Sequence, residues 1–499
     1  MHHWVDMLEV VHLNVSTKSR KSDYILKNIS FKLVAGNRIG LIGPSGAGKS
    51  LLAATIMVLN EENLLVEGQI IYNGVDLLTC SSAHLDTLRG KDLAIIFQNP
   101  EATFNPVRTI GSQLHEAITI HQDLSYPERV SLINNFLQRL QLHDVKDIFK
   151  LYPHQLSGGQ LQRLTVIMSI INQPKLIIAD EITSSLDEEN TEIIVSFLDE
   201  YSDKYQCGLI FISHDQKQVY RLTDRFIYIE NGTIKYNIRK EDTQTTPIIN
   251  QYFEWSFGEK VIHNHSENTP LIEMQNGAKS YKVGKFFNKH HVDVFKGVSF
   301  LVHLGEIVGI YGASGSGKST LAKVLSGVTS LDKGTIFISG SRITQIHKIN
   351  PRDVQIVFQD SFFTFNPKYT IGTLLQEVYH VYRDLYPNED FMQVLTPLID
   401  KFNLSPELLN SYSQTLSGGQ RQRFAIIQCL LVKPKCLILD ESLSALDRKN
   451  QIQILEALTY LRNETDLTTI IISHDLDLVR FAADRIYTFL NGNIGLQLL

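Results

Sequence analysis

Two eight-residue segments of the chain have the spacing of a phosphate-binding loop. Residues 43–50 read Gly-Pro-Ser-Gly-Ala-Gly-Lys-Ser, and residues 312–319 read Gly-Ala-Ser-Gly-Ser-Gly-Lys-Ser. Glycines allow such a loop to wrap a phosphate with its backbone N–H groups, the lysine reaches the β and γ phosphates, and the serine can bind Mg²⁺. One match in a chain of this length would be suggestive, whereas two matches predict two nucleotide sites.

The residues expected to bind nucleotide lie in these loops or directly after them. In the first copy they are Gly43, Ser45, Gly46, Gly48, Lys49 and Ser50, and in the second copy they are Gly312, Ser314, Gly315, Gly317, Lys318, Ser319 and Thr320. Each loop follows a short apolar run and precedes a segment of helical character. We therefore expect strands over 38–42 and 306–311, and helices over 51–59 and 320–325.

An acidic pair ends an apolar run in each half of the chain. The pairs are Asp180-Glu181 and Asp440-Glu441. The carboxyl ends of parallel strands meet at the edge of a sheet where phosphates bind, so both pairs should lie beside the phosphate-binding loops. In each pair the Asp can hold Mg²⁺ directly or through water, and the Glu can orient and polarise the attacking water.

Two further polar residues recur near these pairs. His214 and His474 each follow four apolar residues of β character, and an imidazole at this place can steady charge that develops on the γ-phosphate. Gln98 and Gln359 each follow an apolar run and could contact either Mg²⁺ or the water. The predicted catalytic residues are therefore Glu181, His214, Glu441 and His474.

The similarity between the two halves extends beyond these residues, which makes the chain an internal repeat. Residues 27–31, 96–98, 156–160 and 212–215 of the first half match residues 296–300, 357–359, 416–420 and 472–475 of the second. The first copy has several extra residues between Ser50 and Gln98, which we expect in a surface loop.

Each copy changes character along its length. Alternating apolar residues over 8–15 and 271–274 predict strands, and apolar residues at helical spacing dominate 105–155, with 366–415 as its counterpart. Short, wholly apolar runs follow at 175–179, 208–212, 436–439 and 468–472, as in buried parallel strands. The fold class is therefore α/β, with a helical subdomain inserted in each core. The predicted domains are 1–235 and 271–499, joined by a linker over 236–270 that is rich in polar residues.

Composition narrows the class of protein. The 499 residues are 43% hydrophobic and 20% charged, and the net charge of −6 gives no electrostatic footprint for nucleic acid. The four cysteines are too few and too scattered for a disulfide framework or a metal site. No apolar run approaches the roughly 18 residues of a membrane span, and Asp6 and Glu9 interrupt any signal sequence, so we expect a chain that neither spans a membrane nor is secreted.

The sequence Leu-Ser-Gly-Gly-Gln at 156–160 and 416–420 resembles the signature of ATP-binding cassette (ABC) ATPases. The resemblance covers nearly the whole chain twice and implies two tandem P-loop NTPase domains, each with a RecA-like α/β core and an N-terminal antiparallel β subdomain. In that family two ATP molecules are sandwiched head to tail, each between one domain's P-loop and the other domain's signature. The resemblance thus implies that Ser417 and Gly419 complete the first site, and that Ser157 and Gly159 complete the second.

The same resemblance implies ATP and Mg²⁺ as cofactors and an aromatic residue that stacks on adenine. The implied Mg²⁺ ligands are Ser50, Gln98, Asp180, Ser319, Gln359 and Asp440. Tyr281 corresponds to the stacking residue in the second copy, and Tyr24 is a weaker candidate in the first.

The segments after Gln98 and Gln359 resemble the ATPases of oligopeptide, dipeptide and nickel importers. Residues 97–106 read Phe-Gln-Asn-Pro-Glu-Ala-Thr-Phe-Asn-Pro, and residues 358–367 share the Phe-Gln at their start and the Phe-Asn-Pro at their end. This resemblance implies a fused ATPase subunit at the cytoplasmic face of the cell membrane, two permease partners, an extracytoplasmic solute-binding protein acting through them, and no nucleic acid. In that subfamily the two ATPases are usually separate polypeptides.

The sequence departs from the family pattern at three positions and leaves two alternatives open. Ile182 and Ser442 stand where a proline is expected after the catalytic Glu, and Leu161 stands where a polar residue usually follows the signature. One alternative is the ATPase of an energy-coupling-factor vitamin or metal importer, whose glutamine segment also reads Phe-Gln-Asn-Pro. The other is a soluble tandem ABC protein that acts on ribosomes or DNA, for which a charged linker or a basic face is typical.

Overall fold

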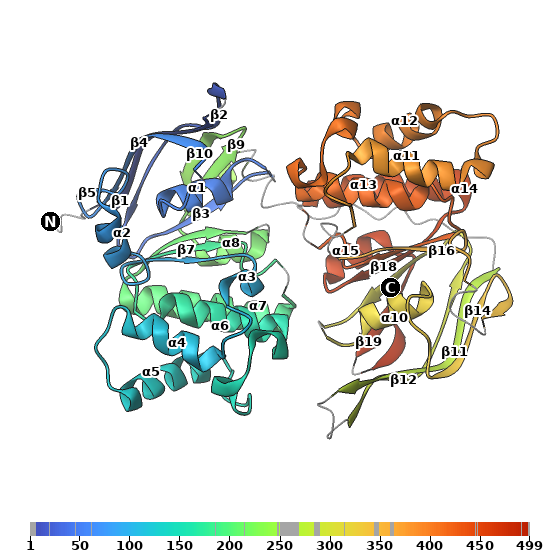
Figure 1. Cartoon of the computed structure of the whole chain (residues 1–499), viewed down its shortest axis with the longest axis horizontal. Helices are drawn as coiled ribbons and strands as arrows, with labels where there is room; N and C mark the ends of the chain where they lie inside the picture. Colours follow the sequence, from blue (N-terminus) through green and yellow to red (C-terminus); the bar gives the residue numbers. More distant parts are fainter. Residues whose placement is uncertain are drawn as a thin grey trace. The chain divides into compact units, whose positions relative to one another are not determined.

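The computed structural model divides the chain into two compact units, residues 1–255 and 256–499 (Figure 1). It describes residues 6–18, 20–44, 46–60, 62–184, 186–213, 215–246, 249, 269–283, 290–313, 315–343, 349–359, 364–444, 446, 448–490 and 492–497. Each unit is built from one antiparallel sheet, one larger sheet that is mostly parallel, and helices. Among the described residues, no helix combines the length and the apolar composition needed to cross a bilayer.

The first unit contains two sheets. The antiparallel sheet has the order β2-β1-β4-β5, and the larger sheet has the order β10-β9-β3-β8-β7-β6, in which only the edge strand β10 runs antiparallel to its neighbour. The strands are β1 (Asp6–Thr17), β2 (Arg20–Val34), β3 (Arg38–Ile42), β4 (Leu64–Tyr72), β5 (Val75–Asp76), β6 (Leu93–Ile96), β7 (Leu176–Asp180), β8 (Gly208–Ile212), β9 (Arg225–Glu230) and β10 (Thr233–Arg239).

Helices cover the larger sheet on both faces, which explains why its central strands are apolar apart from Arg38 at the start of β3 and Asp180 at the end of β7. Every residue of β3, β7 and β8 is buried. One core cluster joins a face of this sheet to the antiparallel sheet and α1, and another joins the opposite face to the helical subdomain. The helices are α1 (Lys49–Ile56), α2 (Ser82–Leu88), α3 (Pro100–Thr103), α4 (Ile110–Thr119), α5 (Tyr126–Arg139), α6 (Gly158–Ile170), α7 (Glu188–Tyr205), α8 (Gln216–Leu222) and the 3₁₀ turns η1 (Ile148–Lys150), η2 (Pro153–Gln155) and η3 (Lys240–Thr245).

The second unit repeats this plan with sheet orders β12-β11-β14-β15 and β16-β17-β18-β13-β19-β20. Its strands are β11 (Pro270–Val283), β12 (His290–His303), β13 (Ile307–Tyr311), β14 (Lys333–Ile338), β15 (Ser341–Ile343), β16 (Val354–Val357), β17 (Cys436–Asp440), β18 (Thr468–Ser473), β19 (Arg485–Leu490) and β20 (Asn493–Gln497). Its helices are α10 (Lys318–Leu325), α11 (Ile371–Val381), α12 (Phe391–Lys401), α13 (Gly418–Leu430), α14 (Arg448–Thr465), α15 (Leu476–Ala482), η6 (Arg383–Leu385), η7 (Pro406–Asn410) and η8 (Ser413–Thr415).

The predicted α/β class, the antiparallel subdomains and the inserted helices are confirmed, whereas several boundaries differ. Both helices after the phosphate-binding loops begin earlier than predicted, at Lys49 and Lys318, because the last loop glycine takes the place of the N-cap. The interval that is longer in the first copy is not all loop, since it contains α2, which Ser81 caps. Strand β10 continues to Arg239 and η3 follows it, so regular structure runs past residue 235, where we place the start of the linker.

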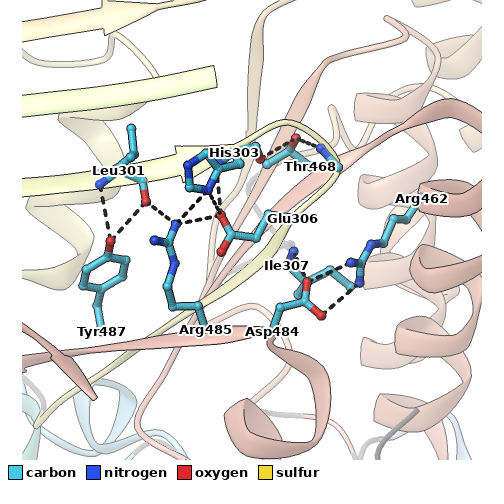
Figure 2. A network of polar contacts seen from close by, with 10 residues as sticks. Leu301, His303, Glu306, Ile307, Arg462, Thr468, Asp484, Arg485 and Tyr487 are labelled. Carbon is cyan, nitrogen blue, oxygen red and sulfur yellow. Dashed lines mark hydrogen bonds and ion pairs between the residues drawn. The ribbon is translucent and has the colours of Figure 1, made fainter. Parts of the chain in front are cut away.

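A polar network ties the two sheets of the second unit together (Figure 2). Arg485, at the start of β19, donates from Nη2 to the Leu301 carbonyl on β12 at 2.7 Å and to Glu306 Oε2 at 2.8 Å. Tyr487 Oη donates to the same Leu301 carbonyl at 3.1 Å. Arg462 on α14 contacts Asp484, which also accepts a hydrogen bond from the Ile307 backbone N–H at 2.8 Å.

Candidate functional site

The two phosphate-binding loops have the same internal arrangement. Each lies between a strand and a helix, and Lys49 Nζ donates to the carbonyls of Gly43 and Pro44 at 2.9 and 3.0 Å. In the second unit Lys318 Nζ donates to the carbonyls of Gly312 and Ala313, both at 2.8 Å. Both lysines are buried. Each loop therefore holds an ammonium group within its own curve, where a phosphate can meet it.

The loop glycines are needed for two different reasons: two of them lie too close to a neighbouring strand for a side chain, and two others have a positive φ and face open space. A Cβ on Gly43 would lie 2.0 Å from the Ile229 carbonyl oxygen, and one on Gly312 would lie 2.3 Å from that of Phe489, so only glycine fits the close approach to β9 and β19. Gly46 and Gly315 have φ of +80° and +75° and face open space. These two positions leave the concave side of the loop open to a ligand.

A serine and an aspartate meet beside each loop. Ser50 Oγ donates to Asp180 Oδ1 at 3.0 Å, and Ser319 Oγ donates to Asp440 Oδ1 at the same distance. Burial raises the pKa of Asp440, while the Ser319 hydrogen bond partly opposes this effect. A buried carboxylate beside a hydroxyl is a donor set that suits Mg²⁺, which takes few protein ligands and fills its other positions with water and phosphate oxygens. These two pairs therefore fit the metal that the sequence implies.

In the first unit, Gln98 and Glu181 are in contact. Gln98 Nε2 donates to Glu181 Oε2 at 3.0 Å and lies 3.4 Å from Ser184 Oγ. Gln98 follows β6 and Glu181 follows β7, and these parallel neighbours bring the two side chains to one edge of the sheet. The predicted proximity of this glutamine to the acidic pair is therefore present.

In the second unit, the glutamate contacts the loop lysine. Glu441 Oε1 lies 3.1 Å from Lys318 Nζ, and Glu441 Oε2 lies 3.9 Å from His474 Nδ1. Glu441 is buried, whereas Gln359 is exposed at the end of β16. The structure thus brings together the lysine, glutamate and histidine that the sequence assigns to this site.

Both glutamates have a backbone conformation that the sequence does not reveal. Glu181 has φ of +50° and Glu441 has φ of +49°, in the left-handed region that is costly for residues other than glycine. Their N–H groups donate to the Ile212 and Ile472 carbonyls at 2.8 and 3.0 Å, which anchors each turn to the adjacent strand. With this backbone conformation, Glu441 contacts Lys318 and Glu181 contacts Gln98.

The signature segments lie at helix starts. Ser157 and Ser417 are the N-caps of α6 and α13, and each forms a capping box with the glutamine three residues later. Gly158 and Gly418 are exposed, and a Cβ on either would meet no atom within 4 Å. Gly159 and Gly419 lie one residue further into these helices. These serines therefore lie on the helical part of each unit and present an exposed helix start.

The departures from the family pattern are explained by packing. Leu161, Ile182 and Ser442 are all buried, and Leu161 and Ile182 belong to the core cluster of the helical subdomain. At the position that matches Leu161, Arg421 Nη1 donates to the Ser413 carbonyl at 3.2 Å. The two units thus have an apolar residue, Leu161, and a polar residue, Arg421, at this position.

Several predicted residues lie elsewhere or cannot be placed. Tyr281 is on β11, partly exposed, with Lys279 Nζ 5.5 Å from its ring centroid, and Tyr24 is exposed on β2. Thr320 lies in the first turn of α10. Ser45, His214 and Ser314 lie outside the described residues, as does most of the predicted linker.

Sequence reasoning missed two serines beside the glutamates. Ser184 Oγ donates to the Glu181 carbonyl at 3.0 Å, and Ser444 Oγ donates to the Glu441 carbonyl at 2.6 Å. These bonds close the turn that holds the glutamate at positive φ. The signal was present in the sequence, because each serine follows its glutamate by three residues, as in a serine-stabilised turn.

Comparison with known proteins identifies the family. A family model described as "ABC transporter" matches residues 26–184 and 295–444. The archaeal ribosome recycling factor aABCE1, solved in complex with the ribosomal stalk protein aP1, is similar in structure with a TM-score of 0.62 and 19% identity over 96% of this chain and 89% of that chain. At this identity the likeness concerns the fold alone.

Curated relatives match almost the whole chain. The chain is 30% identical to the uncharacterized ABC transporter ATP-binding protein YejF of Escherichia coli, over 98% of this chain and 94% of that protein. It is 32% identical to the peptidoglycan transport ATP-binding protein YejF of Agrobacterium fabrum (94% and 88%), and 29% identical to the glutathione import ATP-binding protein GsiA of Salmonella paratyphi A (98% and 85%). With two matched cassettes and paired loop, aspartate and glutamate sites, the chain belongs to the ABC transporter family and is one of its ATPases.

Proposed function

We propose that the chain is the ATP-hydrolysing subunit of an importer for peptide-like solutes. The observation that carries this proposal is similarity over nearly the full length to proteins named for peptidoglycan transport and glutathione import, which, like this chain, span both cassettes. Peptide-like cargo is favoured over nickel because none of these relatives is named for a metal. We place the chain at the cytoplasmic face of the membrane, with two permease subunits and, through them, an extracytoplasmic solute-binding protein.

Each unit supplies the residues for one hydrolytic centre. In this proposal Lys49 and Lys318 exchange their loop carbonyls for phosphate oxygens, and the two serine–aspartate pairs would hold Mg²⁺, which would neutralise charge on the phosphates; the hydrogen bonds of these residues support the assignment. Gln98 and Gln359 are the further candidates for the metal or the water.

Glu181 and Glu441 orient the attacking water and accept its proton. His474, beside Glu441, stabilises negative charge that develops on the γ-phosphate, and His214 has the same role in the first unit. The glycines of both loops, together with Ser45, Ser314 and Thr320, bind the phosphates through N–H and hydroxyl groups. Tyr281 stacks on the adenine of the second site.

We further propose that the signature of each unit completes the site of the other. Ser417 and Gly419 would meet nucleotide on the first loop, and Ser157 and Gly159 would meet nucleotide on the second. The exposed, capped helix starts support this assignment, because an N-terminal turn with free N–H groups favours an anion.

A crossed double variant tests this pairing. In a Glu441→Gln background only the first loop hydrolyses ATP, so Ser417→Arg should abolish the remaining single turnover while Ser157→Arg should leave most of it. The reverse holds in a Glu181→Gln background. Equal effects of both serine variants in both backgrounds would contradict the pairing.

Uptake of a labelled oligopeptide by cells that lack the chain tests the importer assignment. The wild-type chain should restore uptake, the Glu181→Gln, Glu441→Gln double variant should not, and the wild-type chain should sediment with membranes that contain the permeases. Salt-sensitive sedimentation with ribosomes would favour the soluble alternative instead. Dependence on a small membrane specificity component, without a solute-binding protein, would favour the energy-coupling-factor alternative.

A further inference from the structure

The first unit has a cavity at the end of its parallel strands that lies opposite the phosphate-binding loop. Its volume is about 990 Å³. Residues at the start of β3 and β9 line it, whereas the loop follows the other end of β3. Side chains of β1, β2 and β10 complete the wall, so the cavity lies where the antiparallel and parallel sheets meet. It is therefore distinct from the nucleotide site.

In the second unit, the network of Figure 2 lies at the corresponding end of the parallel strands. There the guanidinium of Arg485 is neutralised by Glu306 at 2.8 Å, and Tyr487 bridges to the carbonyl of Leu301 on β12. The equivalent of Arg485 in the repeat is Arg225, since both begin the strand that follows an aspartate. In the second unit, the arginine at this position therefore binds a carboxylate of the same chain.

Among the residues that the structure describes in the first unit, none forms an ion pair with Arg225. Asn37 occupies the position of Glu306, directly before the loop-bearing strand, and Ile227 occupies that of Tyr487. Arg225 donates from Nε to Asn237 Oδ1 and from Nη1 to the Lys32 carbonyl at 3.2 Å, both neutral acceptors. Burial, and next the neighbouring Arg239, lower the pKa of Arg225.

The acidic residues of the wall do not replace the missing partner. Asp6 and Glu9 form ion pairs with Lys32, with oxygen atoms 2.7 and 3.0 Å from its Nζ. Asp224 and Asp242 also line the cavity, so its wall carries both negative and positive charges. Selectivity for an acidic ligand would therefore depend on the guanidinium of Arg225. Two half-buried apolar residues on the same wall, Val34 and Ile238, offer a surface for an aliphatic group.

We propose that this cavity binds a carboxylate ligand with an aliphatic part, in which Arg225 takes the carboxylate that Glu306 supplies in the second unit. The planar fork of an arginine matches a carboxylate with two parallel hydrogen bonds, and the volume suits a small molecule or the end of a peptide. Arg225 already joins β9 to β2 and β10 through the Lys32 carbonyl and Asn237, and a bound carboxylate would add to this link, as Glu306 adds to that of Arg485 in the second unit. It would therefore stabilise the first unit.

Calorimetric titration of the full chain with N-acetyl-leucine and with N-acetyl-leucinamide tests this site. The two probes differ only in the carboxylate, so the acid should bind saturably and raise the first unit's melting temperature, while the amide should bind at least tenfold more weakly. Titration with acetate distinguishes two sources of the carboxylate, a free small acid and the C-terminus of a peptide. Acetate that binds as tightly as N-acetyl-leucine indicates a free small acid. Much weaker binding of acetate indicates a peptide C-terminus. Equal binding of acid and amide, or no saturable binding of any carboxylate, would overturn the proposal.

A matched pair of variants tests the mechanism without disturbing the core. Asn37 is exposed, so Asn37→Glu supplies the missing carboxylate and should abolish binding of N-acetyl-leucine, whereas the neutral Asn37→Gln should retain it. Arg225→Met should also lose binding. Retention of wild-type affinity by Asn37→Glu, with loss in Asn37→Gln, would contradict the assignment even if Arg225→Met fails to fold.

Discussion

The two units agree at the phosphate end of their parallel strands and differ at the opposite end. At the phosphate end, the loop lysine bonds to its own carbonyls and the serine–aspartate distance is 3.0 Å in both. At the other end, each unit ties its long helix to the sheet with an arginine, but the arginine lies on strand β3 in the first unit and on helix α14 in the second. The contacts of the lysine, serine and aspartate at the phosphate end are the same in both units. The contact that links the long helix to the sheet uses different residues in each unit.

Replacement of the glycine that begins each loop should have the largest effect on stability. Gly43→Ala places a Cβ 2.0 Å from a backbone oxygen at φ of +143°, and Gly312→Ala meets a similar contact at 2.3 Å, so we expect each to destabilise its unit by about 3 kcal/mol or more. Hydrogen exchange, resolved by unit, measures this loss.

The matched controls are Gly158→Ala and Gly418→Ala, where a Cβ meets open space. They should change stability by less than about 0.5 kcal/mol. A large cost at these helix starts, or none at the loops, would show that the shared end of the two units is less constrained than their common geometry indicates.

The arginine ties should differ in strength. Arg462 and its partner Asp484 are 3% and 17% exposed, whereas the partners of Arg38, Asp199 and Asp203, are 37% and 77% exposed. Loss of one partner leaves a buried charge uncompensated in the second unit, so Arg462→Met should cost about 3 kcal/mol and Arg38→Met about 1 kcal/mol. Unfolding followed by exchange in each unit measures both, and the opposite order would break the comparison.

Removal of the Asp440 charge should stabilise the second unit, and this effect should be smaller than the destabilising effects above. Because burial raises the pKa of Asp440, the folded unit binds a proton more readily than the unfolded chain, and its stability falls as pH rises from the ordinary aspartate range through the raised pKa. Asp440→Asn removes this penalty. It should raise the melting temperature of the nucleotide-free second unit at pH 8, with little change at pH 4, while abolishing stabilisation by Mg²⁺ with ATP.

The sequence was sufficient for the parts of the fold that local pattern controls. The apolar runs that became β7, β8, β17 and β18 were recognisable because strands buried on both faces need no alternation. The position of Asp180 and Asp440 beside the loop serines followed from the rule that the carboxyl ends of parallel strands meet at the edge of the sheet where phosphates bind. These features depend on residues close in sequence or on a single rule of topology.

Other features depend on pairings that no local pattern encodes. Arg38 meets helix α7 across 161 residues of sequence, and nothing near Arg38 indicates this partner. The left-handed conformation of Glu181 contradicts the preference of its residue type and is imposed by its hydrogen bond to β8. The cavity of the first unit brings Arg225 together with Lys32 and Asn37, which lie far from it in the sequence.

We propose that each glutamate serves its own hydrolytic centre, so that one chain hydrolyses two ATP molecules. Rapid-quench single turnover of Glu181→Gln with ATP saturating both sites tests it most directly. One bound ATP per chain should be hydrolysed while the second persists at least about 100-fold longer, and Glu441→Gln should give the mirror result. Hydrolysis of both ATP molecules at the wild-type rate in either variant would contradict the account.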